Sequence, residues 1–291
     1  MAAEAKAHLH QFTELWDGFS GITFGVEELL FSGTSEYQRV EVLKTDRFGR
    51  LMLLDGLVML TERDEFVYHE MIAHPALCLH PDPRRVLVIG GGDGGTVREV
   101  LRHPGIEHVD LVEIDGLVID AARRFFPTVA SALDEPRLSV RVEDGLAFAR
   151  NAPAGSYDVV LVDSTDPVGF AEGLFGRAFY EDCVRALGDD GILVSQTESP
   201  FDTAFQTSIK AAHGLLGESF AHVAFYLAHI PTYPMGTWSF VMASKTRRPL
   251  GDFDTGEAAR RLAGFEGELR YYNPDLHRGA FALPTFVRRL F

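Results

Sequence analysis

A run of glycines directly after a short apolar segment constrains the fold of this chain most. Residues 86–89 are aliphatic and mostly β-branched, and five of the next six positions, 90–95, are glycine. Glycine tolerates positive φ and lets a ligand approach the backbone closely, so such a run after a strand is typical of a nucleotide-binding turn. The one position in this run that is not glycine is Asp93, whose charge would repel a phosphate and attract a cation. The turn therefore predicts a nucleoside ligand that carries positive charge.

Apolar segments typical of buried strands alternate with helical patterns from residue 86 onward. The expected strands are 86–89, 109–113, 138–142, 159–163 and 192–195, and the helices between them are 97–103, 117–126, 146–151 and 177–187. This alternation predicts a doubly wound, mostly parallel α/β sheet, Rossmann-like and of the methyltransferase type. We expect a helix at 203–216 and an antiparallel edge formed by the apolar runs 223–230 and 238–243.

The first sixty residues have a different pattern, in which short strands are separated by turns. Residues 37–44, 50–54 and 57–60 are the clearest strands, and they predict a small antiparallel sheet. Helical spacing begins at Thr61, which we expect to cap a helix with acidic residues in its first turn and Pro75 inside it or near its end. We therefore expect a small N-terminal β domain, residues 1–62, and a catalytic domain, residues 63–291.

Composition narrows the class of protein and its partners. The 291 residues include 42 acidic and 27 basic side chains, a formal net charge of -15, which disfavours nucleic acid as a partner. No apolar run is long enough to span a membrane, and residues 1–10 lack the apolar core of a secretory signal. Cys78 and Cys183 are far apart in the sequence. These features predict a cytoplasmic protein with reduced thiols and no membrane partner.

Acidic residues follow four successive expected strands. Because ligands bind beyond the carboxyl ends of the strands in such sheets, these acids should lie at one edge. Glu113 stands just over 20 residues after Gly90, where an acid commonly binds the ribose hydroxyls. Each acid has an ordinary structural alternative, such as a helix N-cap for Asp144 or a turn at Asp166 before Pro167. Together they predict a nucleoside site, and its acids are Asp93, Glu113, Asp144, Asp163 and Asp166.

The charges of this site also discriminate between nucleoside ligands. NAD and ATP carry phosphates that the acids would repel, and the chain has no GxxxxGK[ST] sequence. S-adenosylmethionine would place a carboxylate near Asp93. Its decarboxylated form keeps the sulfonium and the amine and lacks that carboxylate, so it fits the acidic edge best.

Seven short motifs give the chain a resemblance to a known family. In order along the chain they resemble motifs of the polyamine aminopropyltransferases, the spermidine synthases, and the likeness runs from about Trp16 to the C terminus. The motifs are Leu-Asp-Gly at 54–56, Thr-Glu-Arg-Asp-Glu-Phe at 61–66, Tyr-His-Glu-Met at 68–71, the glycine run at 90–95, Glu-Ile-Asp at 113–115, Asp-Ser-Thr-Asp-Pro at 163–167 and Pro-Thr-Tyr-Pro at 231–234.

The resemblance implies transfer of an aminopropyl group from decarboxylated S-adenosylmethionine to an amine such as putrescine, which gives spermidine and 5′-methylthioadenosine. The sulfonium provides the leaving group, so the resemblance implies no cofactor and no metal, with the donor as a co-substrate. It also implies a homodimer or homotetramer. Two alternatives stay open: an S-adenosylmethionine-dependent methyltransferase of a cationic small molecule, and a non-catalytic polyamine-binding protein.

The family's motifs also imply roles for individual residues. Asp163 would accept the proton of the attacking amine. The expected donor-binding residues are Gln38, Gly91, Asp93, Glu113, Asp144 and Gly145. The expected acceptor-binding residues are Trp16, Tyr68, His69, Asp166, Glu198 and Tyr233, although His69 could instead serve helix packing. Segment 168–176, directly after Pro167, would form a gate loop that includes Gly169 and Gly173.

One position departs from the family's pattern. Met59 stands where many members carry a glutamine. Methionine forms no strong hydrogen bond and adapts its shape to its neighbours. Exclusive use of putrescine is therefore in doubt, and cadaverine, agmatine or a longer polyamine are alternative acceptors.

Overall fold

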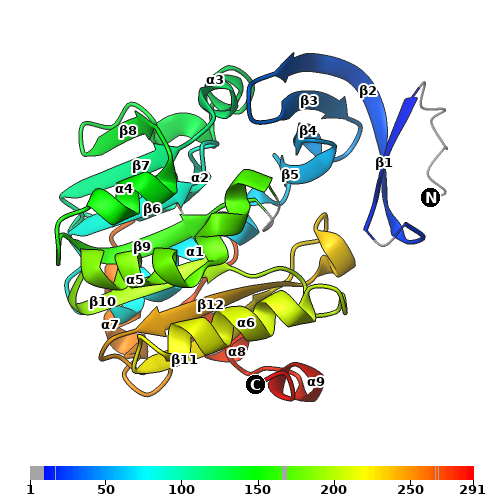
Figure 1. Ribbon diagram of the computed structural model, residues 1–291. Coiled ribbons are helices and arrows are strands. Elements are labelled where there is room, and N and C mark those ends of the chain that lie inside the picture. The colour runs from blue at the N-terminus through cyan, green and yellow to red at the C-terminus, as the bar shows by residue number, and fades with distance from the viewer. Residues whose placement is uncertain (1–9, 17, 166–168, 266, 268) are drawn as a thin grey trace.

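The computed structural model describes residues 10–16, 18–165, 169–265, 267 and 269–291, and it contains two β-sheets (Figure 1). A five-stranded antiparallel sheet near the N terminus has the order β1-β2-β3-β4-β5, and a seven-stranded mixed sheet has the order β11-β12-β10-β9-β6-β7-β8. None of the helices among these residues is both long and apolar enough to cross a membrane.

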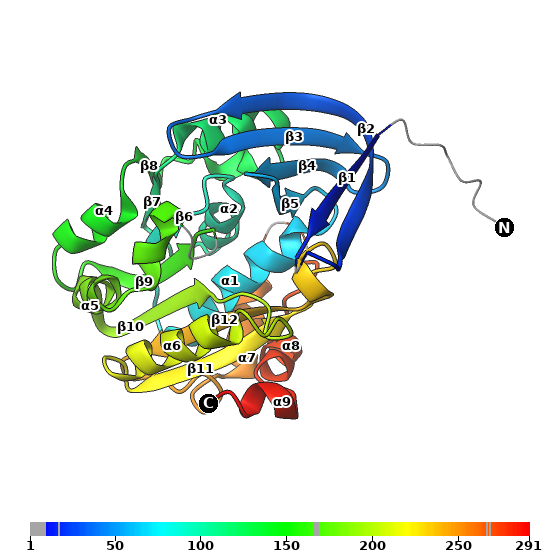
Figure 2. The ribbon, with the colours of Figure 1, turned by 45° about the vertical axis from the view of Figure 1, so that its right-hand side comes forward.

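The N-terminal sheet consists of β1 (His10–Leu15), β2 (Gly21–Thr34), β3 (Arg39–Thr45), β4 (Gly49–Leu54) and β5 (Leu57–Thr61). Side chains alternate along it: Leu51 and Leu53 pack in a small core of this sheet, whereas Met52 and Leu54 join the main core. The sequence did not define β1 and β2 individually. Register shifts after Val26 and Leu29 interrupt the alternation along β2, which explains why its pattern is weak. Figure 2 shows β1 and β2 as a hairpin at the edge of the sheet.

Helix α1 (Glu65–Leu79) links the two sheets and is buried along its length, with every residue except Phe66 in the interior. A helix that is buried on all sides belongs to the core, which accounts for its lack of a polar face. The expected start at Thr61 is wrong. Thr61 ends β5, and its hydroxyl donates to Asp64 Oδ1 at 2.5 Å, so the chain turns before the helix begins at Glu65. Pro75 lies inside the helix.

The larger sheet confirms the predicted doubly wound arrangement with an antiparallel edge. Its parallel strands are β6 (Arg85–Gly90), β7 (His108–Glu113), β8 (Leu138–Val142), β9 (Tyr157–Asp163) and β10 (Leu187–Gln196). Strands β12 (Trp238–Ser244) and β11 (His222–Ala228) extend the sheet antiparallel beyond β10.

Helices cover both faces of this sheet. On one face α1, α2 (Gly95–Leu101) and α3 (Gly116–Phe125) share a hydrophobic core with Val86 and Val88 of β6. On the other, α4 (Gly145–Asn151), α5 (Arg177–Ala186) and α6 (Gln206–Gly217) share a hydrophobic core with Leu87 and Ile89, and α6 lies over β11 and β12. This alternation explains why β6 reads as a continuous apolar run, since both of its faces are buried.

Three short C-terminal helices were not anticipated from the sequence: α7 (Thr255–Leu262), α8 (Pro274–Ala280) and α9 (Thr285–Arg288). Asp254 caps α7 by accepting from Glu257 N at 2.9 Å, and Asn273 caps α8 by accepting from Leu276 N at 2.8 Å. Only one residue of α7 is buried, so its sequence carries a weak core pattern.

Candidate active site

A cavity of about 490 Å³ lies at the carboxyl ends of β6, β7 and β9, where the N-terminal sheet meets the larger one. In doubly wound sheets this is the usual position of a ligand site. The cavity brings together ten residues predicted from the sequence, namely Gln38, Tyr68, His69, Gly91, Asp93, Glu113, Asp144, Gly145, Asp163 and Tyr233.

The glycine run is needed because acidic side chains approach its backbone. Gly90 and Gly91 have φ values of 79° and 71°, which side chains rarely adopt. A Cβ on Gly91 would lie 2.6 Å from Asp163 Oδ2, and one on Gly92 would lie 2.7 Å from Glu113 Cγ. The glycines therefore allow the ends of three neighbouring strands to converge on one ligand position.

Glu113 is buried against this turn at the end of β7. Its carboxylate accepts from Gly92 N at 3.1 Å and from Asp115 N at 2.9 Å. Burial raises the pKa of Glu113 to about 7, against the opposing effect of these two backbone donors. Gln38 from the N-terminal sheet donates to Asp115 Oδ2 at 3.0 Å, which fixes the loop between β2 and β3 next to Glu113.

Asp144 and Gly145 lie at the start of α4. The Asp144 carboxylate caps this helix by accepting from Leu146 N at 2.8 Å, and it also lines the cavity. A Cβ on Gly145 would lie 2.6 Å from Ile89 Cγ2, so glycine lets α4 pack closely against β6.

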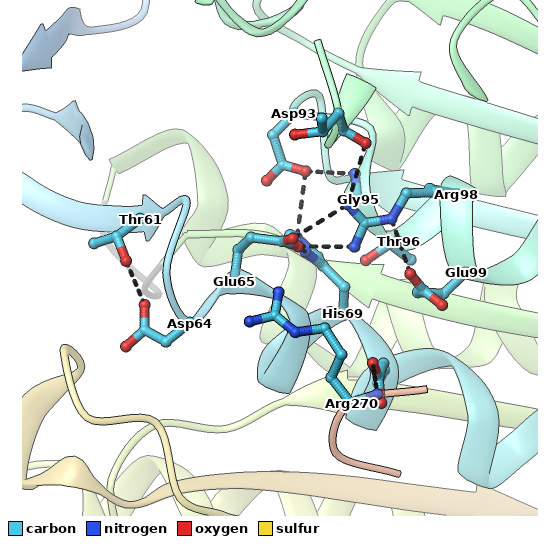
Figure 3. Close-up of polar contacts among 12 residues, drawn as sticks. Thr61, Asp64, Glu65, His69, Asp93, Gly95, Thr96, Arg98, Glu99 and Arg270 are labelled. Atoms are coloured by element: carbon cyan, nitrogen blue, oxygen red, sulfur yellow. Dashed lines mark hydrogen bonds and ion pairs between the residues drawn. The ribbon is translucent and has the colours of Figure 1, made fainter. Parts of the chain in front are cut away.

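The buried His69 and the partly buried Asp93 form an ion pair beside the turn (Figure 3). His69 Nε2 lies 3.3 Å from Asp93 Oδ1, and its Nδ1 lies 2.6 Å from Glu65 Oε2. Burial opposes the charged form of the ring, but the two carboxylates outweigh it and raise the pKa of His69 to about 10. Asp93 experiences the converse effect. Burial disfavours its charge, whereas His69 and Gly95 N, which donates at 2.6 Å, together hold the pKa of Asp93 below its usual range.

Asp163 lies across the turn from Asp93, at the end of β9. Its Oδ2 accepts from Thr96 Oγ1 at 2.6 Å, and the Tyr68 hydroxyl donates to the same carboxylate. Burial and the charge of Asp93 raise the pKa of Asp163, and His69 and the two hydroxyls limit the rise. The site thus contains two neighbouring aspartates whose pKa values are shifted in opposite directions.

Aromatic side chains form another wall of the cavity. The rings of Tyr68 and Tyr233 have their centroids 5.8 Å apart, and Tyr233 also packs against Trp238 at 4.9 Å. The Tyr233 hydroxyl donates to the backbone carbonyl of Met59 at 2.5 Å. The side chain of Met59 is partly buried and the residue lines the cavity, so the departure from the family's glutamine falls at the site itself.

Several polar residues that line the cavity were missed in the sequence, among them Glu14, Asp64 and Gln196. Glu14 from β1 is buried and accepts from Val58 N at 2.8 Å. Asp64 accepts from Thr232 Oγ1 at 2.8 Å and joins the start of α1 to the loop of Tyr233. Gln196 donates to Ser164 O at 3.1 Å and supports the segment after Asp163. Gln196 could have been found, because it ends a parallel strand as Glu113 and Asp163 do, whereas no sequence signal connected Glu14 to this site.

The remaining predicted residues lie elsewhere or outside the described part of the chain. Trp16, in the turn after β1, and the buried Glu198, whose φ is 69°, do not line this cavity. Asp166 and Pro167 fall outside the described residues. Gly169 and Gly173 belong to a 3₁₀ segment, η2 (Gly169–Phe175), which contributes Leu174 to the cavity wall.

The fold and the site together define a class of protein: doubly wound α/β proteins whose site, at the carboxyl ends of the strands, is lined by acidic side chains. Comparisons with known proteins identify the family within this class. The model of the spermine/spermidine synthase domain matches residues 65–254, and that of the spermidine synthase tetramerisation domain matches residues 11–62.

Curated relatives and solved structures agree with this match. The polyamine aminopropyltransferase of Alkaliphilus metalliredigens is 49% identical over 267 residues, which are 92% of each chain, and that of Clostridioides difficile is 44% identical over 96% of this chain and 97% of its own. A spermidine synthase solved in complex with the transition state analogue AdoDATO has a TM-score of 0.92, with 39% identity over 98% of this chain and 95% of that one. Spermidine synthase from Thermotoga maritima has a TM-score of 0.89, with 38% identity over 98% and 94%.

The chain belongs to the spermine/spermidine synthase family and is an enzyme of the polyamine aminopropyltransferase kind.

Proposed function

We propose that the protein transfers the aminopropyl group of decarboxylated S-adenosylmethionine to putrescine or a related amine. The observation that carries this proposal is the pair Asp93 and Asp163, which lie on either side of one glycine turn with opposite pKa shifts. When the environments of two acids push their pKa values apart, the acids commonly have separate roles. One aspartate then remains an anion, and the other can accept a proton.

The donor is proposed to bind along the turn with its amine at Asp93. Both described contacts of this carboxylate are made to Oδ1, so Oδ2 is the natural partner of the amine. Glu113 would accept from the ribose hydroxyls, with Gln38 and Gly91 beside it. Asp144 and Gly145, at the outer rim of the cavity, would bind the adenine. A donor that retained its carboxylate would place this group next to Asp93, so the charges favour the decarboxylated form.

The acceptor nitrogen is proposed to lie between Asp163 and the sulfonium. A primary amine has a pKa of about 10, like that of lysine, and therefore arrives protonated. Asp163 takes the proton, and the freed lone pair attacks the methylene carbon that is bonded to sulfur. As the new C–N bond forms, the C–S bond breaks and its electron pair stays on sulfur, which leaves neutral 5′-methylthioadenosine. Alignment in a closed cavity is expected to supply a large part of the rate.

The residues at the end of the cavity away from the donor favour an acceptor that carries a second positive charge. Tyr68, Tyr233 and Trp238 would pack against the methylene chain, with His69 behind them, and Glu14 would lie near the distal amine. We also propose that Trp16, Asp166 and Glu198 bind the acceptor and that segment 168–176 is the gate loop, as the resemblance to the family implies. Met59 lets the wall adapt its shape, so we propose that amines longer than putrescine are also accepted.

We propose further that residues 1–62 form an assembly domain and residues 63–291 the catalytic domain of a homodimer or homotetramer. The match to a tetramerisation domain supports this division. So do exposed apolar side chains on the hairpin of β1 and β2: Leu15 is 54% exposed, Phe19 96% and Leu29 53%. Exposed apolar side chains on an edge strand are commonly covered by another subunit.

The reaction is tested by incubating the purified protein with decarboxylated S-adenosylmethionine and each of putrescine, cadaverine, agmatine and spermidine. We expect release of 5′-methylthioadenosine together with an amine extended by one aminopropyl group. In parallel, S-adenosylmethionine is supplied with the same amines. A methylated amine in this arm would favour the methyltransferase alternative, and binding without any product in either arm would favour the binding protein.

A further inference from the structure

A chain of buried charges runs from the site into the protein and involves two residues that the proposed reaction does not use. Glu65 belongs to the Thr-Glu-Arg-Asp-Glu-Phe motif, and Arg98 follows the glycine run on α2. Arg98 donates to both carboxylate oxygens of Glu65, at 3.2 Å and 2.8 Å, and Glu65 Oε2 contacts His69 Nδ1 (Figure 3). His69 in turn contacts Asp93.

Each member of this chain is held from more than one side. Arg98 also donates to Glu99 Oε1 at 2.8 Å and to Thr128 O at 3.3 Å, so its guanidinium is fixed. The side chains of His69 and Glu65 are only 3% and 8% exposed. A Cβ on Gly95 would lie 2.2 Å from His69 Cε1, so the ring fills the space that this glycine leaves. The ring therefore has one orientation, with each nitrogen facing a carboxylate.

This orientation distinguishes the two aspartates of the site. The charged groups that face His69 are Glu65 on its own helix, Asp93 from the turn after β6 and Asp163 from the end of β9. The ring contacts Asp93 directly, whereas Asp163 is bonded to the hydroxyls of Thr96 and Tyr68. A doubly protonated imidazole can donate to Glu65 and Asp93 at the same time, which a neutral ring cannot do.

We propose that Glu65 and Arg98 are positioning residues for aminopropyl transfer, which hold the His69 ring against Asp93 and so keep Asp93 a fixed anion for the amine of the donor. This inference rests on the proposed function, because it assigns that amine to Asp93. It gives a role to Arg98, which does not line the cavity, and to Glu65, which lines it with its carboxylate in contact with His69 and Arg98. The bidentate pair explains the use of arginine, since lysine has no planar fork.

The test variant is Glu65→Gln, which keeps the shape of the side chain and removes its charge. Without that charge, burial is expected to let His69 lose its proton near neutral pH. NMR of the imidazole nitrogens measures this proton, and the signal of His69 is identified by its absence in His69→Gln. At pH 8.5 we expect a doubly protonated His69 in the wild type, whereas in Glu65→Gln the ring should titrate between about pH 6 and 8. At each pH the donor kcat/KM of Glu65→Gln is divided by that of the wild type. We expect this ratio to fall about tenfold between pH 6.5 and 8.5, whereas KM for the acceptor should not change.

Glu70→Gln is the matched control, because Glu70 lies on the same helix and is equally buried. Its carboxylate accepts from the backbone N–H groups of residues 270, 271 and 272, a purely structural role. This variant should be less stable, with an unchanged titration of His69 and an unchanged pH profile. If Glu65→Gln does not fold, Arg98→Gln takes its place in the kinetic measurement. Loss of this cation does not favour deprotonation of His69, so donor kcat/KM should fall about tenfold at every pH because Glu65 is no longer held, and Arg98→Lys should show a loss of about threefold.

The inference is overturned if His69 stays protonated at pH 8.5 in Glu65→Gln, or if donor kcat/KM is the same as in the wild type in the Glu65 and Arg98 variants. Failure of the proposed function has a different signature: the wild type would release no 5′-methylthioadenosine at any pH. The NMR measurement would still report in that case whether Glu65 holds the His69 proton.

Discussion

At the scale of single residues, the opposite pKa shifts of Asp93 and Asp163 predict different losses from the same substitution. Asp163→Asn keeps the shape but removes the proton acceptor, so we expect kcat to fall by about 100-fold or more while donor affinity stays within about threefold. Asp93→Asn removes a charged partner of the donor's amine and should weaken donor binding by about 10- to 100-fold. Stopped-flow turnover and calorimetric binding of the donor check both. Similar turnover in Asp163→Asn and wild type would refute the assignment of the base.

Glu113 gives a prediction about pH. Its pKa of about 7 means that it is largely protonated at pH 6 and ionised at pH 8, and ribose hydroxyls donate best to the ionised form. Affinity should therefore rise as the pH increases through 7. Methylthioadenosine is the suitable probe for calorimetry, because it has the ribose and lacks the aminopropyl chain whose amine Asp93 would bind. Asp93→Asn should keep this pH dependence and Glu113→Gln should lose it, and a flat wild-type profile would contradict the role of Glu113.

At the scale of elements, the close approach of α1 to α2 depends on Gly95. A Cβ there would overlap the fixed ring of His69, at 2.2 Å from Cε1. We expect Gly95→Ala to lower the free energy of unfolding by about 2 kcal/mol and to reduce donor kcat/KM by about 100-fold, because the ring must move. Gly214→Ala is the control, since Gly214 lies inside α6 with no atom within 4 Å of an added Cβ. It should stabilise the protein by about 0.5 to 1 kcal/mol in chemical denaturation.

The elements also show how much of the structure could be predicted from the sequence. The parallel strands were predictable because both of their faces are buried, and the acids at their ends were predictable because parallel strands end at one edge. Thr61 was misassigned as a helix cap because its partner, Asp64, is itself fixed by Thr232, 168 residues away. Glu14 was missed for a similar reason: it reaches the site only because the N-terminal sheet docks over the larger one. Contacts of this kind depend on tertiary packing, which local patterns do not encode.

At the scale of the whole molecule, the hairpin of β1 and β2 gives the last prediction. Leu29 is 53% exposed on β2, at a position where an apolar side chain is costly in water unless another subunit covers it. Leu29→Asp would place a charge in such an interface without disturbing the core of the monomer, so we expect a smaller assembly of unchanged secondary structure. Light scattering coupled to size exclusion gives the mass. Phe201→Asp is the matched control, because Phe201 is 51% exposed in the segment between β10 and α6, and it should leave the mass unchanged. If Leu29→Asp keeps the wild-type mass, or if Phe201→Asp dissociates the assembly, the interface does not lie on this hairpin.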